Sequence, residues 1–105
     1  MTTRNGSSPA MEFLERLTGG RLTLAEALFS IRSGEGWSQA EMGRRLGISR
    51  AHLCDIEKGR RTVSPDRAAR FARILGYSET QFVRLALQDQ LNQSGLKMTV
   101  SVDAA

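Results

Sequence analysis

The sequence has few of the residues on which several classes of protein depend. Among its 105 residues there is one cysteine, Cys54, and one histidine, His52. One cysteine excludes a disulfide framework, and with a single histidine beside it a conventional zinc site is a poor prospect. We therefore expect no metal or other cofactor, and the cysteine count suits a reducing cytoplasm.

Long apolar runs are also missing. None approaches the roughly 20 residues that a membrane-spanning helix needs. The opening stretch, MTTRNGSSPAMEFLERL, has neither a long apolar core nor a cleavage pattern, so we expect no signal peptide. With 40% hydrophobic residues, a chain of this length is expected to fold as one small cytoplasmic domain.

The same scarcity argues against an enzyme. His52 and Cys54 are two residues apart, and on a helix such residues point about 200° away from each other. They cannot form a nucleophile–base pair. No glycine-rich phosphate loop follows a strand either. We therefore expect no catalytic residues, and Cys54 is either a thiol sensor or an incidental, partly exposed residue.

Positive charge is what the sequence has in excess. Lysine and arginine number 15 against 11 aspartates and glutamates, which gives a net charge of +4. This balance favours a polyanionic partner. Many proteins are mildly basic, so the identity of the partner depends on motifs.

Residues 38–57, SQAEMGRRLGISRAHLCDIE, predict two short helices joined by a tight turn. The first is expected over 39–46. Ser38 is its N-cap, and Glu41 three residues later completes a capping box. Gly47 takes the turn, because glycine adopts a positive φ without steric cost.

Ser49 is the N-cap of the second helix, which is expected to reach Lys58 before a glycine ends it. Gly43 faces the crossing of the two helices, where a side chain larger than alanine would hold them apart. On a helical wheel the second helix turns Leu53, Ile56 and Ser49 inward. The side chains that point outward are Arg50, Ala51, Cys54, Asp55 and Lys58.

This segment resembles the helix-turn-helix of the lambda repressor-like family, also called the Cro/repressor or Xre type. The residues that carry the resemblance are Gln39, Gly43, Leu46-Gly47-Ile48-Ser49, Leu53 and Ile56-Glu57-Lys58-Gly59. The resemblance covers about residues 22–87. It implies an all-α, five-helix DNA-binding domain, to which we add a helical N-terminal extension and a C-terminal β-strand.

The resemblance implies that the start of the second helix reads bases, here with Arg50, Ala51 and Asp55. Arg50 is suited to a bidentate contact with guanine, and Ala51 to the thymine methyl group. Asp55 either accepts from cytosine or pairs with Arg50. Phosphate contacts are expected from Gln39, Ser49, His52, Lys58, Arg60 and Arg61, in preference to a merely solvated basic loop.

In similar proteins a glutamate at the place of Glu57 pairs with an arginine of the first domain helix. That arginine is Arg32 here, and we expect the pair to be structural. Three further helices are expected, over about 24–33, 65–75 and 79–93. The arginines of the second of these, Arg67, Arg70 and Arg73, are interpreted as a solvated face.

The chain is expected to divide into an N-terminal tail and short helix over 1–21, a domain over 22–93, and a dimerisation segment over 94–105. The helix over 79–93 has an apolar edge beyond what its own core needs, and residues 96–102 alternate as a strand does. The expected interface residues are Val83, Leu87, Leu91, Leu96, Met98, Val100 and Val102. A lone strand is satisfied by pairing with a second copy; a frayed tail is the alternative.

These patterns together predict a homodimeric, sequence-specific transcriptional regulator, a prokaryotic or phage-type repressor that reads a palindromic operator in double-stranded DNA. The alternative is an antitoxin that binds a toxin protein and represses its own operon. DNA binding holds under both hypotheses, which differ in the protein partner.

Overall fold

The computed structural model describes residues 22–105, and five helices form its regular structure. They are α2 (Leu24–Glu35), α3 (Gln39–Leu46), α4 (Arg50–Glu57), α5 (Pro65–Leu75) and α6 (Glu79–Gln93). The prediction of an all-α, five-helix domain is confirmed. The helix predicted within residues 1–21 lies outside the described residues. In residues 22–105 no helix combines the length and the apolar character that crossing a membrane would require.

The first described helix begins and ends at strong local signals. Glu26 N donates to Thr23 Oγ1 at 3.0 Å, and Thr23 N donates to Glu26 Oε1 at 2.9 Å, so the predicted capping box is complete. The helix continues two residues past the expected end. Gly36 then ends it with φ at 74°, in the left-handed region where glycine has no steric cost.

At the start of α3 only half of the predicted capping box forms. Ser38 Oγ accepts from Glu41 N at 3.0 Å, as an N-cap should. The Glu41 carboxylate instead pairs with the guanidinium groups of Arg44 and Arg45, one turn further along the helix. A hydrogen bond from a charged donor is stronger than one from a neutral backbone N–H, which accounts for this choice.

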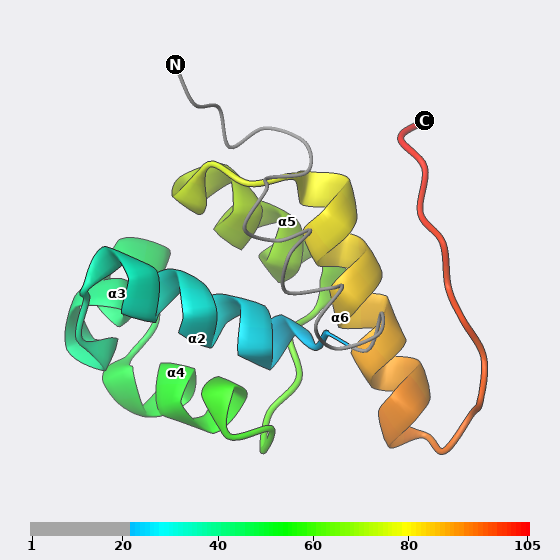
Figure 1. Cartoon of the computed structure of the whole chain (residues 1–105), viewed down its shortest axis with the longest axis horizontal. Coiled ribbons are helices and arrows are strands. Elements are labelled where there is room, and N and C mark those ends of the chain that lie inside the picture. The colour runs from blue at the N-terminus through cyan, green and yellow to red at the C-terminus, as the bar shows by residue number, and fades with distance from the viewer. Residues whose placement is uncertain (1–21) are drawn as a thin grey trace.

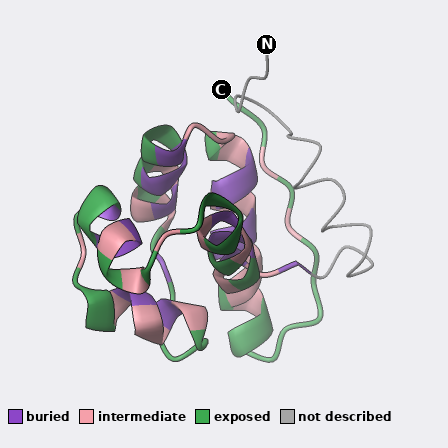
Figure 2. Cartoon of the chain, turned by 60° about the vertical axis from the view of Figure 1, so that its left-hand side comes forward, coloured by how far each residue is buried: buried purple, intermediate pink, exposed green. Residues whose placement is uncertain are grey.

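The core lies where the α5–α6 pair meets the other three helices. Phe71 of α5 and Phe82 of α6 are its largest fully buried side chains, and Leu28, Met42 and Leu53 join them from α2, α3 and α4. Figure 2 shows the buried residues turned toward the middle of the molecule from every helix. Full burial of such a side chain is worth about 1.5–3 kcal/mol. The shared core therefore fixes α4 in place from behind.

The crossing of α3 and α4 depends on Gly43. A Cβ atom added there would lie 2.8 Å from the backbone oxygen of Ile48. The obstacle is backbone, which cannot move aside as a flexible side chain can. The sequence predicts that nothing larger than alanine fits, and the structure shows that even an alanine collides.

The predicted C-terminal strand is wrong for the described chain. Residues 96–105 are extended but form no strand, and they run back alongside α6 (Figure 1). Gln88 of α6 takes the place of a neighbouring strand: its Nε2 donates to Met98 O at 2.7 Å, and its Oε1 accepts from Val100 N at 2.9 Å. The backbone groups that were expected to need a second strand are thus partly satisfied by one side-chain amide.

Candidate nucleic-acid interface

Helix α4 has one packed face and one free face. Leu53 and Ile56 are buried, at 0% and 2% exposure, whereas Arg50 and Ala51 are exposed. Ser49, which the helical wheel turned inward, is exposed and serves as the N-cap: its Oγ accepts from His52 N at 3.0 Å. An N-cap lies outside the regular helical geometry, so the wheel does not apply to it.

Asp55 is paired with Arg60, not with Arg50. Arg60 Nη2 and Nε donate to Asp55 Oδ1 at 2.8 and 3.1 Å. These hydrogen bonds raise the pKa of Arg60 above its ordinary value. The Asp55 backbone also holds the turn, since its carbonyl oxygen accepts from Arg60 N at 2.8 Å. Asp55 therefore orients the basic loop that follows the helix.

Glu57 is the centre of a three-residue cluster behind α4. Arg32 donates to it from Nε at 2.8 Å and from Nη2 at 3.0 Å, and Gln39 Nε2 donates at 3.0 Å. The Glu57 side chain is 5% exposed, and its hydrogen bond raises the pKa of Arg32. Arg32 also donates to Trp37 O at 3.1 Å. These bonds tie α2, α3 and α4 together.

The cluster changes what Gln39 offers to DNA. The sequence assigns its side chain to a phosphate, but in the structure that amide is bonded to Glu57. Its backbone N–H remains at the first position of α3, where helix N-terminal N–H groups favour an anion. The structure thus brings Gln39 beside the end of α4 through a bond that sequence reasoning did not anticipate.

Arg67 is a residue of this surface that sequence reasoning missed. Its Nη1 lies 3.3 Å from His52 Nε2, so the first turn of α5 meets the first turn of α4. The solvated-face interpretation suits its two neighbours: Arg73 pairs with Glu79, and Arg70 is exposed above the ring of Phe71. No local pattern separates Arg67 from them, because the contact depends on how two helices pack.

The loop after α4 contains the remaining residues that are predicted to contact DNA phosphates. Lys58, Arg60 and Arg61 are all exposed, and Gly59 makes the turn between them with φ at 75°. Val63, 5% exposed, anchors the end of the loop in the core. Cationic side chains therefore lie beside the free face of α4 on a loop that is fixed at both ends.

Comparison with known proteins agrees with this geometry. Residues 23–85 match a family described as "Helix-turn-helix domain". The chain belongs to this helix-turn-helix family. A search of curated proteins finds no match. Among solved structures, the chain is similar to the crystal structure of a hypothetical transcription factor, NHTF, from Neisseria, with 29% identity and a TM-score of 0.53. The similarity covers 70% of this chain and 83% of that one.

The predicted interface residues lie at and beyond the end of the helix-turn-helix match. Val83, Leu87 and Leu91 are half-buried along α6. On the C-terminal segment, Leu96 and Met98 are 44% and 60% exposed. Val100 and Val102, also on that segment, are half-buried. Apolar side chains at the C-terminal end of the described chain are thus partly or largely exposed.

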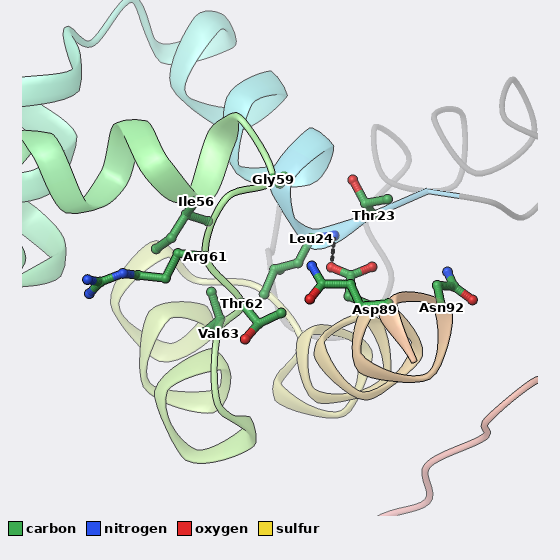
Figure 3. A pocket seen from close by; sticks show the side chains of 11 residues that line it. Thr23, Leu24, Ile56, Gly59, Arg61, Thr62, Val63, Asp89 and Asn92 are labelled. Carbon is green, nitrogen blue, oxygen red and sulfur yellow. Dashed lines mark hydrogen bonds between the residues drawn. The ribbon is translucent and has the colours of Figure 1, made fainter. Parts of the chain in front are cut away.

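A pocket of about 150 Å³ lies on the inner side of the basic loop, between the start of α2 and the end of α6 (Figure 3). Asp89 Oδ2 accepts there from Leu24 N at 3.1 Å. Burial raises the pKa of Asp89 above its ordinary value, and the hydrogen bond from Leu24 opposes that rise. The Arg61 side chain points away from Asp89, so its guanidinium is not drawn into the pocket.

Proposed function

We propose that the chain is a sequence-specific transcriptional regulator that places α4 in the major groove of double-stranded DNA. The observation that carries the proposal is the exposure of Arg50 and Ala51 on a helix held from behind by Leu53, Ile56 and Glu57. A major groove about 12 Å wide admits an α-helix, and its base edges are distinguishable by hydrogen bonding. A helix that is held in place by the core and exposes the side chains of its first turn suits this kind of recognition.

The residues of α4 and of the loop after it have distinct parts in the proposal. Arg50 donates two hydrogen bonds to a guanine, and Ala51 contacts a thymine methyl group. Asp55 uses one oxygen for Arg60; the other accepts no hydrogen bond among the described contacts and is available to a cytosine amino group. Exposed Lys58, Arg60 and Arg61 contact phosphates and set the register of the helix on the duplex.

We further propose that the active form is a homodimeric repressor. Two copies would place their α4 helices about 34 Å apart and read a palindrome. The apolar side chains at the C-terminal end support this, since Val83, Leu87 and Leu91 form a stripe on α6 and Leu96 and Met98 are exposed. No catalytic chemistry is part of the proposal.

An antitoxin is the second candidate. The exposed Leu96 and Met98 on an extended segment are the observation that favours it, because a partner protein would cover them. Under this proposal the DNA-binding surface is unchanged and the segment 94–105 binds a toxin. Co-purification of a specific protein that is lost on deleting residues 96–105 supports the antitoxin; its retention contradicts that assignment.

Selection of bound duplexes from a random DNA pool at near-physiological salt tests the regulator. The expected result is an enriched palindrome with half-sites about one helical turn apart. A single unpaired half-site contradicts the dimer and leaves base reading intact. Absence of any enrichment contradicts sequence-specific recognition by this chain.

A further inference from the structure

Two basic side chains from different elements meet at the start of α4: His52 of α4 and Arg67 of the first turn of α5. The charge of Arg61, in the loop after α4, acts on the same imidazole. Arg67 Nη1 is 3.3 Å from His52 Nε2, and the charges of both arginines act on the imidazole. Asp55 is the acid that acts on it, and Arg60 already occupies that carboxylate.

The arrangement fixes the protonation of His52 in the free protein. An arginine guanidinium has only donors, so Nε2 must be the acceptor and the ring proton must be on Nδ1. Partial burial, then Arg61 and Arg67, lower the pKa of His52 below its ordinary value, and Asp55 only partly opposes them. A lowered pKa favours the neutral imidazole in the free protein, whereas the two arginines keep their positive charge.

Asp66 interacts with Arg67 from the preceding position of α5. Like charges held close together are nevertheless unfavourable, and an anion that joins them relieves the repulsion. We propose that His52, Arg61 and Arg67 form a binding site for one phosphate of the DNA backbone, and that His52 takes up a proton when the phosphate enters. This rests on the proposed function. Arg67 turns its N–H groups from the imidazole to the phosphate oxygens, and the freed Nε2 accepts a proton from solvent and donates it in a hydrogen bond to the same phosphate.

The consequence is a pH dependence of DNA affinity with a definite sign. A bound phosphate raises the pKa of His52 relative to the free protein, so affinity increases as the pH falls through the interval between the two values. Affinity changes by about tenfold for each unit that separates them. His52 is the only histidine in the sequence, so no other side chain with an ordinary pKa titrates between about pH 5.5 and 7.5.

The test measures binding of a random-sequence duplex by fluorescence anisotropy at pH 5.5 and 7.5, with ionic strength held constant. The wild-type chain is expected to bind up to about tenfold more tightly at pH 5.5. His52→Gln keeps an acceptor for Arg67 but cannot titrate, so its affinity should be the same at both pH values. Equal pH dependence in His52→Gln and wild type would overturn the proposal.

Arg67→Gln and Arg70→Gln form a matched pair, since both arginines are on α5 and only Arg67 contacts His52. Loss of one phosphate contact should lower the slope of log affinity against log salt by about 0.9 in Arg67→Gln only. Equal slopes in the two variants would remove Arg67 from the site.

NMR titration of the His52 ring protons in the wild-type chain, free and bound to the duplex, makes the test independent of any variant. A higher pKa in the complex supports the proposal, and an unchanged or lower pKa contradicts it. If neither this duplex nor any sequence from the random pool is bound, the proposed function fails. If it is bound without a change in the His52 pKa, only this inference fails.

Discussion

At the scale of single residues, Gly43 leaves no room for a side chain, because a Cβ atom there would meet backbone. Gly43→Ala should destabilise the fold by about 1–2 kcal/mol, because the collision with Ile48 O outweighs the gain of about 1 kcal/mol in helix propensity. Gly34→Ala is the control: its Cβ would meet nothing within 4 Å, and α2 should gain up to about 0.5 kcal/mol. Chemical denaturation measures both. Equal effects would contradict the steric account.

Glu57 holds the positions of three helices through one carboxylate. Glu57→Ala should cost about 3 kcal/mol in the free energy of unfolding, because it leaves the half-buried Arg32 guanidinium without its carboxylate partner. Glu41→Ala removes the exposed pairs with Arg44 and Arg45 and should cost less than about 1 kcal/mol. If the two variants lose equal stability, the cluster around Glu57 is not what fixes α4.

At the scale of elements, the helix bounds follow from the sequence because their signals are local. Serines and glycines at 38, 47, 49, 76 and 78 determine where helices begin and end within a turn of themselves. The C-terminal segment shows the limit of such reasoning. Alternation over 96–102 predicts a strand, and that prediction is wrong, because the side chain of Gln88, eight residues earlier, bonds to the backbone of this segment.

The side-chain pairs of the interface were less predictable than the helices. Arg32–Glu57 was expected only through resemblance to a family. Asp55 with Arg60, and His52 with Arg67, join residues whose distance depends on loop geometry and helix packing. Sequence periodicity indicates which face of a helix is free, and it does not determine which charges from neighbouring elements meet there.

The two hydrogen bonds between the Gln88 side chain and the backbone of Met98 and Val100 lead to a prediction about the C-terminal segment. Gln88→Ala should release Val100 N–H, so hydrogen exchange at that amide should become as fast as in a free peptide. Gln90→Ala, an exposed position on the same helix, should leave the exchange rate unchanged. Amide exchange followed by NMR provides the measurement. Fast exchange at Val100 in the wild-type chain would contradict the docking of the segment on α6.

At the scale of the whole molecule, the other helices of the described chain hold the short helix α4 so that its first turn faces outward. The Phe71 and Phe82 core supports α4 from below, and the Glu57 cluster secures its end. The loop after it turns cations toward the same side. The C-terminal segment lies beyond α6, on the side away from α4 (Figure 1). The proposed partner or second copy would therefore bind there without covering α4.

The central claim is that α4 reads bases through Arg50, and parallel selections from one random DNA pool test it most directly. Wild type and Arg50→Ala are selected side by side at the same salt. We expect wild type to require a guanine at one position of each half-site and Arg50→Ala to lose that preference alone, a discrimination of about 1–3 kcal/mol. Identical enriched sequences from both proteins would contradict base reading by Arg50 and, with it, the proposed orientation of α4 on DNA.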